Sequence, residues 1–251
     1  TYEMAKQKPI LEQLLIVVPT YNEAMNIEAL LKAVLAMNDK FDVLVVDDNS
    51  PDGTSAIAQK IAKKDKRVNV IVRKGPKGRG LAAIRAYEYF YKSSYMYMVE
   101  LDADFQENPK DVFKLLEEAE KANADMAIGS RYVKGGGFKS DKRWLSLIAN
   151  FFILIMFNTK IKDLTCTFHA IKRRVFDAIP YAELRSKGFF IASELHLLAE
   201  KSGLKIIEVP IFFPRREKGK TKIDAGVSLD FAKNAILFWL FRRKKRWEKK
   251  R

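Results

Sequence analysis

Five short apolar runs alternate with longer helix-like segments in the first half of the chain, and this alternation constrains the fold more than any other feature. The runs are LLIVV (14–18), FDVLVV (41–46), RVNVIV (67–72), YMYMVEL (95–101) and ADMAIGS (124–130). They are short and rich in β-branched residues, as strands are when helices cover both faces of a parallel sheet. The pattern therefore predicts an α/β fold built from βαβ units with right-handed crossovers.

Two of the intervening segments show helical periodicity. NEAMNIEALLKAVLAM (22–37) and NPKDVFKLLEEAEKA (108–122) each place their large apolar residues on one stripe of a helix. The stripes consist of Ile27, Leu30, Leu31, Val34 and Leu35 in the first segment, and of Val112, Leu115, Leu116 and Ala119 in the second.

Composition sets the remaining bounds. With 251 residues, 48% of them hydrophobic and 31% charged, the chain is expected to form one globular domain with an appendage. The single cysteine, Cys166, excludes a disulfide framework and a multi-cysteine metal site, and we expect it to be a small core residue. We expect no signal peptide, because the first residues do not form a basic segment followed by an apolar one. We also expect no transmembrane span, because the longest apolar run, LIANFFILIMF (147–157), is far shorter than the ~20 residues that a spanning helix needs.

The net charge of +15 is concentrated at the C-terminus. The segment RRKKRWEKKR (242–251) holds eight basic residues against Glu248, which gives +7 in ten positions. Such a segment attracts phosphate groups, either those of a nucleic-acid backbone or those of anionic lipid headgroups, and charge alone does not choose between them.

Polar residues follow each of the first four predicted strands. The strand exits read PTYNE (19–23), DDNSPDGT (47–54), RKGPKGRG (73–80) and DADFQ (102–106). Asp and Asn also suit turns and helix caps, so one such loop would indicate little. Four of them at the carboxyl ends of parallel strands predict a ligand-binding crevice.

The last of these loops predicts a divalent-cation site. Asp102 and Asp104 repel each other unless a cation lies near them, and Mg²⁺ is commonly held by one or two carboxylates together with substrate phosphate oxygens. The amide oxygen of Gln106 would complete this partial site, and a diphosphate would supply the missing ligands. The chain has neither a Walker A spacing nor a GxGxxG pattern, which disfavours a P-loop enzyme and a dinucleotide reader.

Several of these segments together resemble a known family. VVPTYNE, VVDDNSPDGT, GRGLAAIRAY and ELDADFQENP look like the nucleotide-sugar half of family 2 glycosyltransferases with the GT-A fold. GSRYVKGGG (129–137), DLTCTFHAIKRRVF (163–176) and EVPIFFPRREKGKTK (208–222) are similar to segments of dolichol-phosphate mannose synthases and related polyprenyl-phosphate hexosyltransferases. The resemblance covers residues 13–223, which it divides into a donor half (13–130, nucleotide-sugar binding) and an acceptor half (131–223). Residues 224–251 would form a C-terminal amphipathic helix and basic tail.

The resemblance implies roles for individual residues. Asp48, with Asp47 beside it, would recognise the nucleotide base, and the first loop would border base and ribose through Pro19, Tyr21 and Glu23. The cation, Mg²⁺ or Mn²⁺, and the diphosphate would be held by Asp102, Asp104 and Gln106. The acceptor phosphate would be bound by Arg131, Arg143, Arg216 and Lys222, since guanidinium groups bind phosphate with a forked geometry. The residues expected to be catalytic are Asp102, Asp104, Arg131 and Arg216.

Two positions depart from the family pattern. Cys166 and Thr167 occupy a place that is usually small and flexible, and Ser193 stands where a glutamine is common before the later-helix Glu194. We expect these residues to lie near the acceptor or the sugar, so they bear on the identity of the sugar more than on the reaction.

The acceptor half offers few general bases. Its candidates are Asp163, Glu194, His169 and His196, and we expect both histidines to be packing or surface residues. A phosphate acceptor relaxes the need for a base, because a phosphate monoester with a second pKa near ~6 is largely a dianion at neutral pH. The expected reaction is a single in-line displacement with inversion at the anomeric carbon.

Two segments predict attachment to a membrane surface. WLSLIANFFILIMF (144–157) is apolar nearly all round, which suits either a buried core helix or a helix lying in the lipid interface, and relatives carry an interface helix here. In VSLDFAKNAILFWLFRRKKRW (227–247) one apolar side runs into the basic cluster, through Leu229, Ala232, Ile236, Trp239 and Leu240. An apolar helix and a basic segment make a two-signal anchor, so we expect a peripheral or monotopic protein on the cytoplasmic face of an anionic membrane.

The sequence thus favours transfer of mannose from GDP-mannose to dolichyl or polyprenyl monophosphate. UDP-glucose as donor and a soluble or protein acceptor remain alternatives, whereas the intact DAD sequence and the set of arginines argue against a non-catalytic binder. A nucleic-acid-binding module is disfavoured, because the acidic strand exits would repel a phosphate backbone unless they hold metal.

Overall fold

The computed structural model describes residues 10–139, 143–214 and 225–248 of the chain. The strands are β1 (Leu14–Thr20), β2 (Asp42–Asp47), β3 (Val68–Val72), β4 (Tyr97–Glu100), β5 (Met126–Ser130), β6 (Gly137–Phe138), β7 (His169–Lys172), β8 (Ile206–Pro210) and β9 (Phe212–Phe213). The helices are α2 (Ile27–Leu35), α3 (Thr54–Ala62), α4 (Arg79–Lys92), α5 (Asp111–Lys121), α6 (Arg143–Phe157), α7 (Arg174–Ala178), the 3₁₀ helix η1 (Tyr181–Glu183), α8 (Ile191–Lys201) and α9 (Ala225–Glu248).

A seven-stranded sheet in the order β3-β2-β1-β4-β7-β5-β8 forms the centre of the molecule. All five predicted strands are present, and β1 to β4 are parallel to their neighbours in this group. The α/β architecture with a mostly parallel sheet is therefore confirmed. The small strands β6 and β9 pair with each other outside this sheet.

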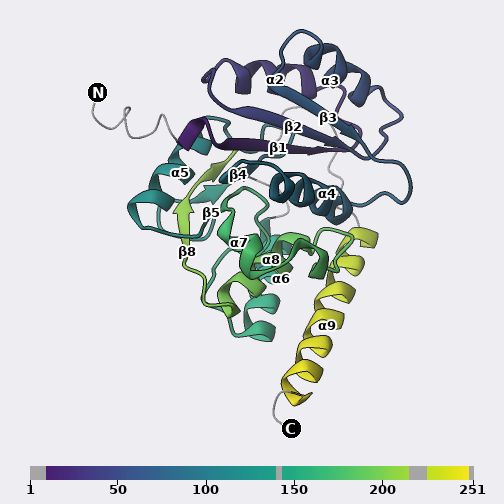
Figure 1. Ribbon diagram of the computed structural model, residues 1–251. Coiled ribbons are helices and arrows are strands. Elements are labelled where there is room, and N and C mark those ends of the chain that lie inside the picture. Colours follow the sequence, from purple (N-terminus) through teal and green to yellow (C-terminus); the bar gives the residue numbers. More distant parts are fainter. Residues whose placement is uncertain (1–9, 140–142, 215–224, 249–251) are drawn as a thin grey trace.

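The predicted helical stripes face the core. In α2 the buried residues are Ile27, Leu30, Leu31 and Val34, and in α5 they are Val112, Leu115, Leu116 and Ala119. Figure 1 shows α2 and α3 on one side of the β1–β3 part of the sheet and α4 on the other. Because helices cover both faces, the strands are mostly apolar, and every residue of β1 is buried.

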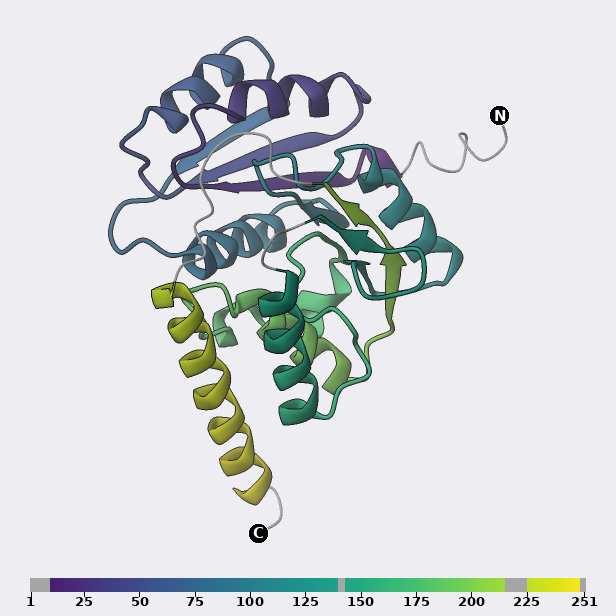
Figure 2. The same ribbon diagram turned by 180° about the vertical axis from the view of Figure 1, so that it is seen from behind.

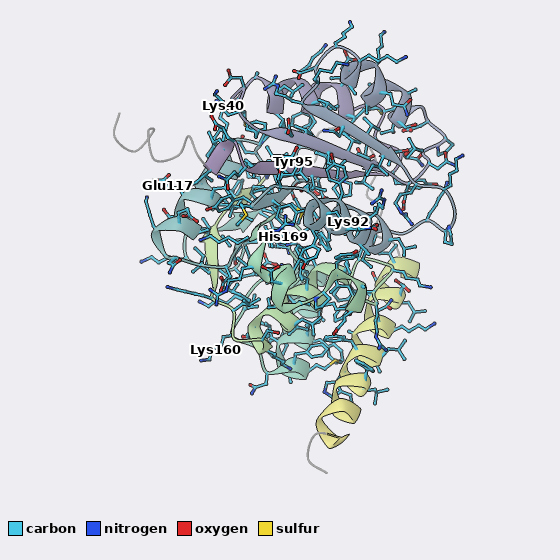
Figure 3. The ribbon with its side chains drawn as sticks, viewed as in Figure 1. Lys40, Lys92, Tyr95, Glu117, Lys160 and His169 are labelled. Carbon is cyan, nitrogen blue, oxygen red and sulfur yellow. The ribbon has the colours of Figure 1, made fainter. Side chains whose placement is uncertain are left out.

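Strand β7 is one of four strands in the described part of the chain that the sequence pattern did not predict. It runs antiparallel between β4 and β5, pairing Glu100 with His169 and Ile128 with His169 on its two sides. A segment of the acceptor half thus lies in the middle of the sheet, and Figure 3 shows His169 at the centre of the fold.

The start of α4 is in backbone contact with the acceptor half. The amides of Gly80 and Leu81 donate to the carbonyl oxygen of Lys187, at 2.9 and 3.3 Å. A Cβ atom on Gly78 would come within 2.4 Å of the same oxygen, and one on Gly80 within 2.2 Å of the carbonyl oxygen of Ser186. Only glycine permits this approach, so the glycines of the GRG segment join the two halves.

Helix α6 covers the predicted interface segment and exposes apolar side chains. Its buried residues include Ile153 and Phe157, and also Asn150, whose amide group contacts the backbone of residues 162 and 164. The large apolar side chains that face solvent are Leu147, Ile148, Phe151, Phe152 and Ile155.

Helix α9 lies beside α6 and extends away from the body of the molecule (Figures 1 and 2). It is anchored by Ala235 and Phe238, which are buried, and by the ring of Phe231 against that of Phe190. Three residues of the apolar side that the sequence indicated are exposed: Leu229, Ile236 and Leu240. No helix in the described part of the chain has both the length and the apolar character needed to cross a membrane.

Candidate active site

Four loops meet at one edge of the sheet, as predicted. Thr20 at the end of β1 is in register with Asp47 at the end of β2, which is in register with Val72 at the end of β3. The order of the strands reverses between β1 and β4, because the chain proceeds to β2 and β3 on one side and returns to β4 on the other. Such a reversal opens a crevice at the carboxyl ends of the strands.

Asp47 shapes the loop that follows β2. It is fully buried, and its carboxylate accepts hydrogen bonds from Thr20 Oγ1 at 2.9 Å, from the Ser50 amide at 2.8 Å and from Ser50 Oγ at 2.6 Å. These contacts use the carboxylate within the protein, and the role of Asp47 at the nucleotide base stays a prediction.

Asp48 connects the second loop to the third. Its carboxylate contacts the guanidinium group of Arg73 and accepts a hydrogen bond of 2.7 Å from the amide of Gly78. The loop that ends in the GRG segment is therefore tied to the residue predicted to recognise the base.

The first loop, residues 19–23, is also held by contacts within the protein. Pro19 is buried within β1, and Glu23 Oε2 accepts a hydrogen bond of 2.9 Å from the side chain of Asn26. Tyr21 is partly exposed and contacts Lys77 of the third loop, whose ammonium group is 3.1 Å from the phenol oxygen and 4.5 Å from the ring centroid. Tyr21 and Lys77 thus border the crevice together.

Asp102 and Asp104 lie just beyond β4. The side chain of Asp102 is 33% exposed, whereas Asp104 is buried and its Oδ1 accepts a hydrogen bond of 3.0 Å from the amide of Gln106. Phe105, between Asp104 and Gln106, has a φ of 59°, which is unusual for a residue of its size and indicates a constrained turn. The structure therefore brings the three predicted cation ligands into one tight loop.

Arg79 is a site residue that the sequence analysis missed. From the N-terminus of α4 its Nη2 atom donates to Asp102 Oδ1 at 3.0 Å and contacts the buried carboxylate of Glu100. Burial alone would raise the pKa of Glu100, but the charge of Arg79 and the contact with His169 lower it to about 2. A basic residue between two glycines at a strand exit was the signal that could have identified it.

Glu107 is a second missed residue. Burial, and then the charges of Asp102 and Asp104, raise the pKa of its carboxyl group well above the usual range. Within the described residues, no hydrogen-bond partner reaches its Oε2 atom. The carboxyl groups of Asp102, Asp104 and Glu107 thus lie close enough to affect one another's pKa.

This crowding of carboxyl groups tests whether the loop suits a cation. Residues 100–107 contain four carboxyl groups, and Arg79 contacts two of them. A divalent cation at Asp102 and Asp104 would reduce the repulsion among these groups. In the described part of the chain, no three His, Cys, Asp or Glu side chains are grouped to hold a metal by themselves. The donor set therefore fits an ion that takes one or two carboxylates and completes its shell with phosphate and water, as Mg²⁺ does.

Arg131, predicted to bind phosphate, is paired inside the protein. Its Nε and Nη2 atoms donate to the two carboxylate oxygens of Asp163 at 2.8 and 2.7 Å. Its guanidinium carbon is 5.4 to 5.5 Å from the ring centroids of Tyr132, Phe138 and Phe213. The guanidinium group is thus fixed in place, and its contact with an acceptor phosphate stays a prediction.

The four candidate bases of the acceptor half are all buried and hydrogen-bonded. Asp163 holds Arg131, and Glu194 accepts bonds from the amides of residues 185 and 186. His169 Nδ1 is 3.0 Å from His196 Nε2, so both histidines are core residues that also bond to each other. None of the four faces the crevice as an accessible base.

The residues that depart from the family pattern also have partners. Thr167 Oγ1 donates to Asp102 Oδ2 at 3.2 Å, Ser193 Oγ donates to the carbonyl oxygen of Leu164 at 2.9 Å, and Cys166 is buried. Burial raises the pKa of the Cys166 thiol, which suits the expected core role. Thr167 is the one of these that contacts a predicted cation ligand.

Three predicted phosphate-binding residues lack described side chains. Arg216 and Lys222 lie outside the described residues. Arg143 is the first residue of α6, and its side chain is not described.

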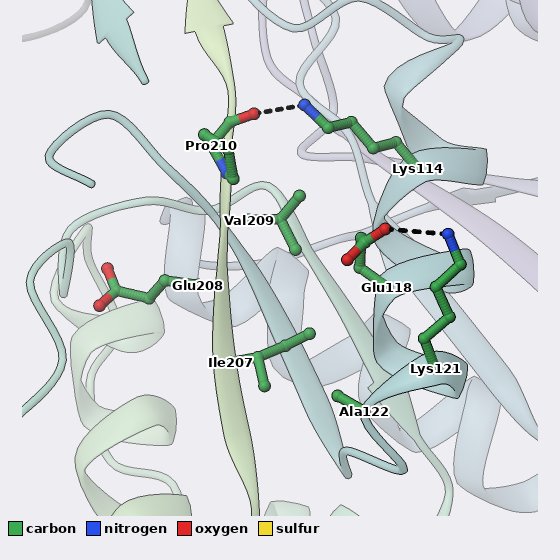
Figure 4. A pocket seen from close by; sticks show the side chains of 8 residues that line it. All are labelled: Lys114, Glu118, Lys121, Ala122, Ile207, Glu208, Val209 and Pro210. Atoms are coloured by element: carbon green, nitrogen blue, oxygen red, sulfur yellow. Dashed lines mark hydrogen bonds and ion pairs between the residues drawn. The ribbon is translucent and has the colours of Figure 1, made fainter. Parts of the chain in front are cut away.

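A shallow hollow of about 640 Å³ lies elsewhere, between α5 and the edge strand β8 (Figure 4). Lys114 closes one end by donating to the carbonyl oxygen of Pro210 at 2.6 Å. The predicted site residues do not line it, and its open, partly charged lining does not suggest a substrate site.

Solved structures show the same architecture. Glucosyl-3-phosphoglycerate synthase from Mycobacterium tuberculosis, in complex with Mn²⁺, uridine diphosphate and phosphoglyceric acid, superposes with a TM-score of 0.73 over 96% of this chain and 82% of that one, at 16% sequence identity. Mannosyl-3-phosphoglycerate synthase from Rubrobacter xylanophilus gives 0.70 over 98% and 79%, at 18% identity. The protein thus has the GT-A type of glycosyltransferase fold.

The family follows from sequence comparison. The model of the family described as "Glycosyl transferase family 2" matches residues 15–179, and the chain belongs to this family. It is 35% identical over 219 residues to the polyprenol monophosphomannose synthase of Mycolicibacterium smegmatis, covering 86% of this chain and 82% of that protein. It is 33% identical over 218 residues to the undecaprenyl-phosphate mannosyltransferase of Micrococcus luteus, covering 86% and 89%. The dolichol-phosphate mannosyltransferase of Pyrococcus furiosus is 34% identical over 228 residues, which are 87% of this chain and 61% of that protein.

Proposed function

We propose that this glycosyltransferase moves a mannosyl group from GDP-mannose to the phosphate of a polyprenyl or dolichyl monophosphate. The observation that carries the proposal is the agreement among relatives that are 33 to 35% identical over most of this chain and are named as polyprenyl- or dolichol-phosphate mannosyltransferases. The loops of the crevice give this reaction a physical basis.

The donor would lie at the edge formed by β1, β2 and β4. Asp48 and Tyr21 would border the nucleoside, and Asp102, Asp104 and Gln106 would hold Mg²⁺ or Mn²⁺ with the diphosphate. The bound cation would supply stabilisation of the charge that develops on the departing nucleoside diphosphate. The crowding of carboxyl groups in residues 100–107 supports this assignment, as does the presence of Mn²⁺ and uridine diphosphate in a solved structure of the same fold.

The acceptor half supports a phosphate acceptor rather than an alcohol. An attacking alcohol needs a base that takes its proton, and the candidates Asp163, Glu194, His169 and His196 are buried and bonded. A phosphate monoester is already largely a dianion at neutral pH, so it needs alignment more than deprotonation. With such an acceptor the reaction would be a single displacement with inversion at the anomeric carbon.

The exposed apolar surface supports a lipid acceptor. Helices α6 and α9 both present large apolar side chains to solvent, and residues 242–251 form a strongly basic segment. Such a combination binds an anionic bilayer surface through buried apolar area and electrostatic attraction. The lipid-bound phosphate would then reach Arg131 from the membrane side, together with Arg143, Arg216 and Lys222.

The experiment that tests the proposal measures transfer of radiolabelled mannose from GDP-mannose into detergent-solubilised dolichyl phosphate, with UDP-glucose as the parallel donor. We expect lipid label from GDP-mannose that requires Mg²⁺ or Mn²⁺. Asp104→Ala should lower the rate by a factor on the order of 10²–10³ or more, because it removes a ligand for the charge-stabilising cation. Asp39→Ala, an exposed carboxylate outside the loops, serves as the matched control.

The outcomes separate the alternatives. Label from UDP-glucose alone would change the donor and the sugar while keeping the reaction class. Label in a water-soluble acceptor and none in lipid would refute the lipid acceptor, and a product with retained anomeric configuration would refute the single displacement.

A further inference from the structure

A chain of buried polar side chains leads from Asp102 into the acceptor half. Arg79 joins Asp102 to Glu100. Glu100 Oε2 accepts a hydrogen bond of 3.0 Å from Tyr87 and lies 3.7 Å from His169 Nε2, a charge contact that is longer than a hydrogen bond. His169 Nδ1 is in turn 3.0 Å from His196 Nε2. Glu100, His169 and His196 are at most 1% exposed, so these contacts form away from water.

The geometry fixes the direction of the hydrogen bonds at the far end. His196 Nδ1 lies 3.3 Å from the carbonyl oxygen of Leu164, which can only accept, so His196 Nδ1 carries the hydrogen. Burial, followed by the charge of His169, lowers the pKa of His196 well below its usual value, which keeps the ring neutral. Its Nε2 atom is therefore an acceptor, and His169 Nδ1 donates to it.

The chain of contacts closes on itself. Leu164 belongs to segment 163–167, whose Thr167 donates to Asp102 Oδ2 at 3.2 Å. The same segment contains Asp163, which holds the guanidinium group of Arg131. The segment is thus tied to Asp102 directly through Thr167 and indirectly through the buried chain.

We propose that Glu100, His169 and His196 are positioning residues that keep Asp102 and segment 163–167 in register. Through them the donor-side carboxylate and the acceptor-side arginine would hold a fixed relative placement. This inference rests on the proposed function, in which Asp102 helps to bind the diphosphate of the donor. Buried ionisable groups are costly to desolvate, and apolar residues of similar volume often give equal or greater stability, so packing alone does not account for the arrangement.

The test measures binding and not only turnover. The double variant His169→Leu/His196→Leu replaces each ring by an apolar side chain of similar volume and removes the chain of contacts. The carbonyl oxygen of Leu164 still accepts its hydrogen bond from Ser193. Titration calorimetry measures the Mn²⁺-dependent binding of GDP, with UDP in parallel. We expect the affinity to weaken by about 10- to 100-fold, as is typical when partners of metal ligands are removed. We also expect the lower rate of transfer to appear in kcat more than in the KM for dolichyl phosphate.

A control separates positioning from stability. Leu197→Ala removes a fully buried side chain from the same helix α8 without touching the polar chain. At a temperature where all proteins are folded, we expect it to bind GDP and Mn²⁺ as the unmodified protein does. Equal affinities for the double variant and the unmodified protein would overturn the inference.

A second variant tests the other connection without disturbing the core histidines. Thr167→Val keeps the branched shape and removes the hydroxyl donor to Asp102, and Thr167→Ser restores it. We expect Val to weaken Mn²⁺-dependent GDP binding and Ser to recover it, and equal binding by the two would count against a positioning role for the segment.

The inference and the proposed function fail in different ways. An unmodified protein that binds GDP with Mn²⁺ but labels no lipid refutes the acceptor, while the binding loss in the histidine variants still supports the positioning role. An unmodified protein that transfers mannose, with histidine variants that bind GDP normally, refutes the positioning role alone. Absence of binding to either nucleotide overturns both.

Discussion

The donor half and the acceptor half expose different chemistry to solvent. In the donor half several loop carboxylates, such as Asp48 and Asp104, are buried, but the side chain of Asp102 at the sheet edge is 33% exposed. In the acceptor half the carboxylate of Asp163 is fully buried against Arg131, and apolar residues such as Phe151, 64% exposed, face solvent. The donor half thus exposes part of a charged loop, and the acceptor half exposes apolar surface.

This contrast matches the two substrates proposed. A nucleotide sugar carries a diphosphate that needs cations and hydrogen-bond donors, which the loops around Asp48 and Asp102 can organise. A lipid phosphate brings its own charge at the end of an apolar chain, so the protein needs an apolar surface and a fixed cation. Substitutions in each half, and at the junction between them, test whether the two halves differ in this way.

The largest effect on stability is expected in the acceptor half at Asp163. Asp163→Ala leaves the mostly buried guanidinium group of Arg131 without its carboxylate, which should cost about 3–5 kcal/mol of unfolding free energy. Urea denaturation measures this loss, with the exposed Asp177→Ala as control. Asp104→Ala should show the reverse pattern, with activity lost and stability largely kept. A small change for Asp163→Ala would show that this ion pair does not hold the acceptor half together.

The junction between the halves is the next most sensitive point. In Gly80→Ala the new Cβ would lie 2.2 Å from the carbonyl oxygen of Ser186, so the start of α4 must shift at a cost of about 1–3 kcal/mol. We expect weaker GDP binding as well, because Arg79 lies beside this residue. Gly203→Ala, where φ is +75° and no atom is near, isolates backbone strain and should leave GDP binding unchanged. Equal effects of the two substitutions would mean that the contact does not couple the halves.

The buried ring of His196 predicts a pH dependence of stability. Burial lowers the pKa of His196 in the folded protein, so below pH ~6.5 the unfolded chain binds a proton that the folded one does not. Stability should therefore fall as pH drops from 6.5 to 5, with His196 contributing at most about 1.4 kcal/mol per pH unit. Denaturation curves at several pH values should show a shallower dependence in His196→Leu. Identical slopes would contradict a neutral buried ring.

The smallest effect on stability is expected on the exposed apolar surface. Phe151→Ser on α6 should change the unfolding free energy by no more than about 0.5 kcal/mol, because the side chain already faces solvent. Sedimentation with vesicles that contain anionic lipid should nevertheless show weaker binding. The buried Ile153→Ser on the same helix should have the opposite profile, with stability lost. Unchanged vesicle binding for Phe151→Ser would argue against α6 as part of the membrane surface.

The sequence determined the elements whose signals are local. The apolar runs predicted the first five strands, and the apolar stripes predicted the helices α2 and α5. Such local signals exist because a buried strand is a short apolar run and a helix with one buried face repeats its apolar residues every three to four positions. Since parallel strands end at the same edge, the order of strands and polar exits along the chain also sufficed to predict one shared crevice. The DADFQ loop and the residue Asp48 were located in this way, although their ligands are still proposals.

Only the tertiary structure decided which distant groups meet. Strand β7 is short and carries no periodic signal, yet its insertion between β4 and β5 places His169 beside Glu100 and brings Thr167 to Asp102. The same packing turned Asp163 from a candidate base into the partner of Arg131. Such contacts join residues that are dozens of positions apart in the chain, and they depend on the order of the strands and on which side chains become buried. The local spacing of residues in a single sequence does not encode either of these.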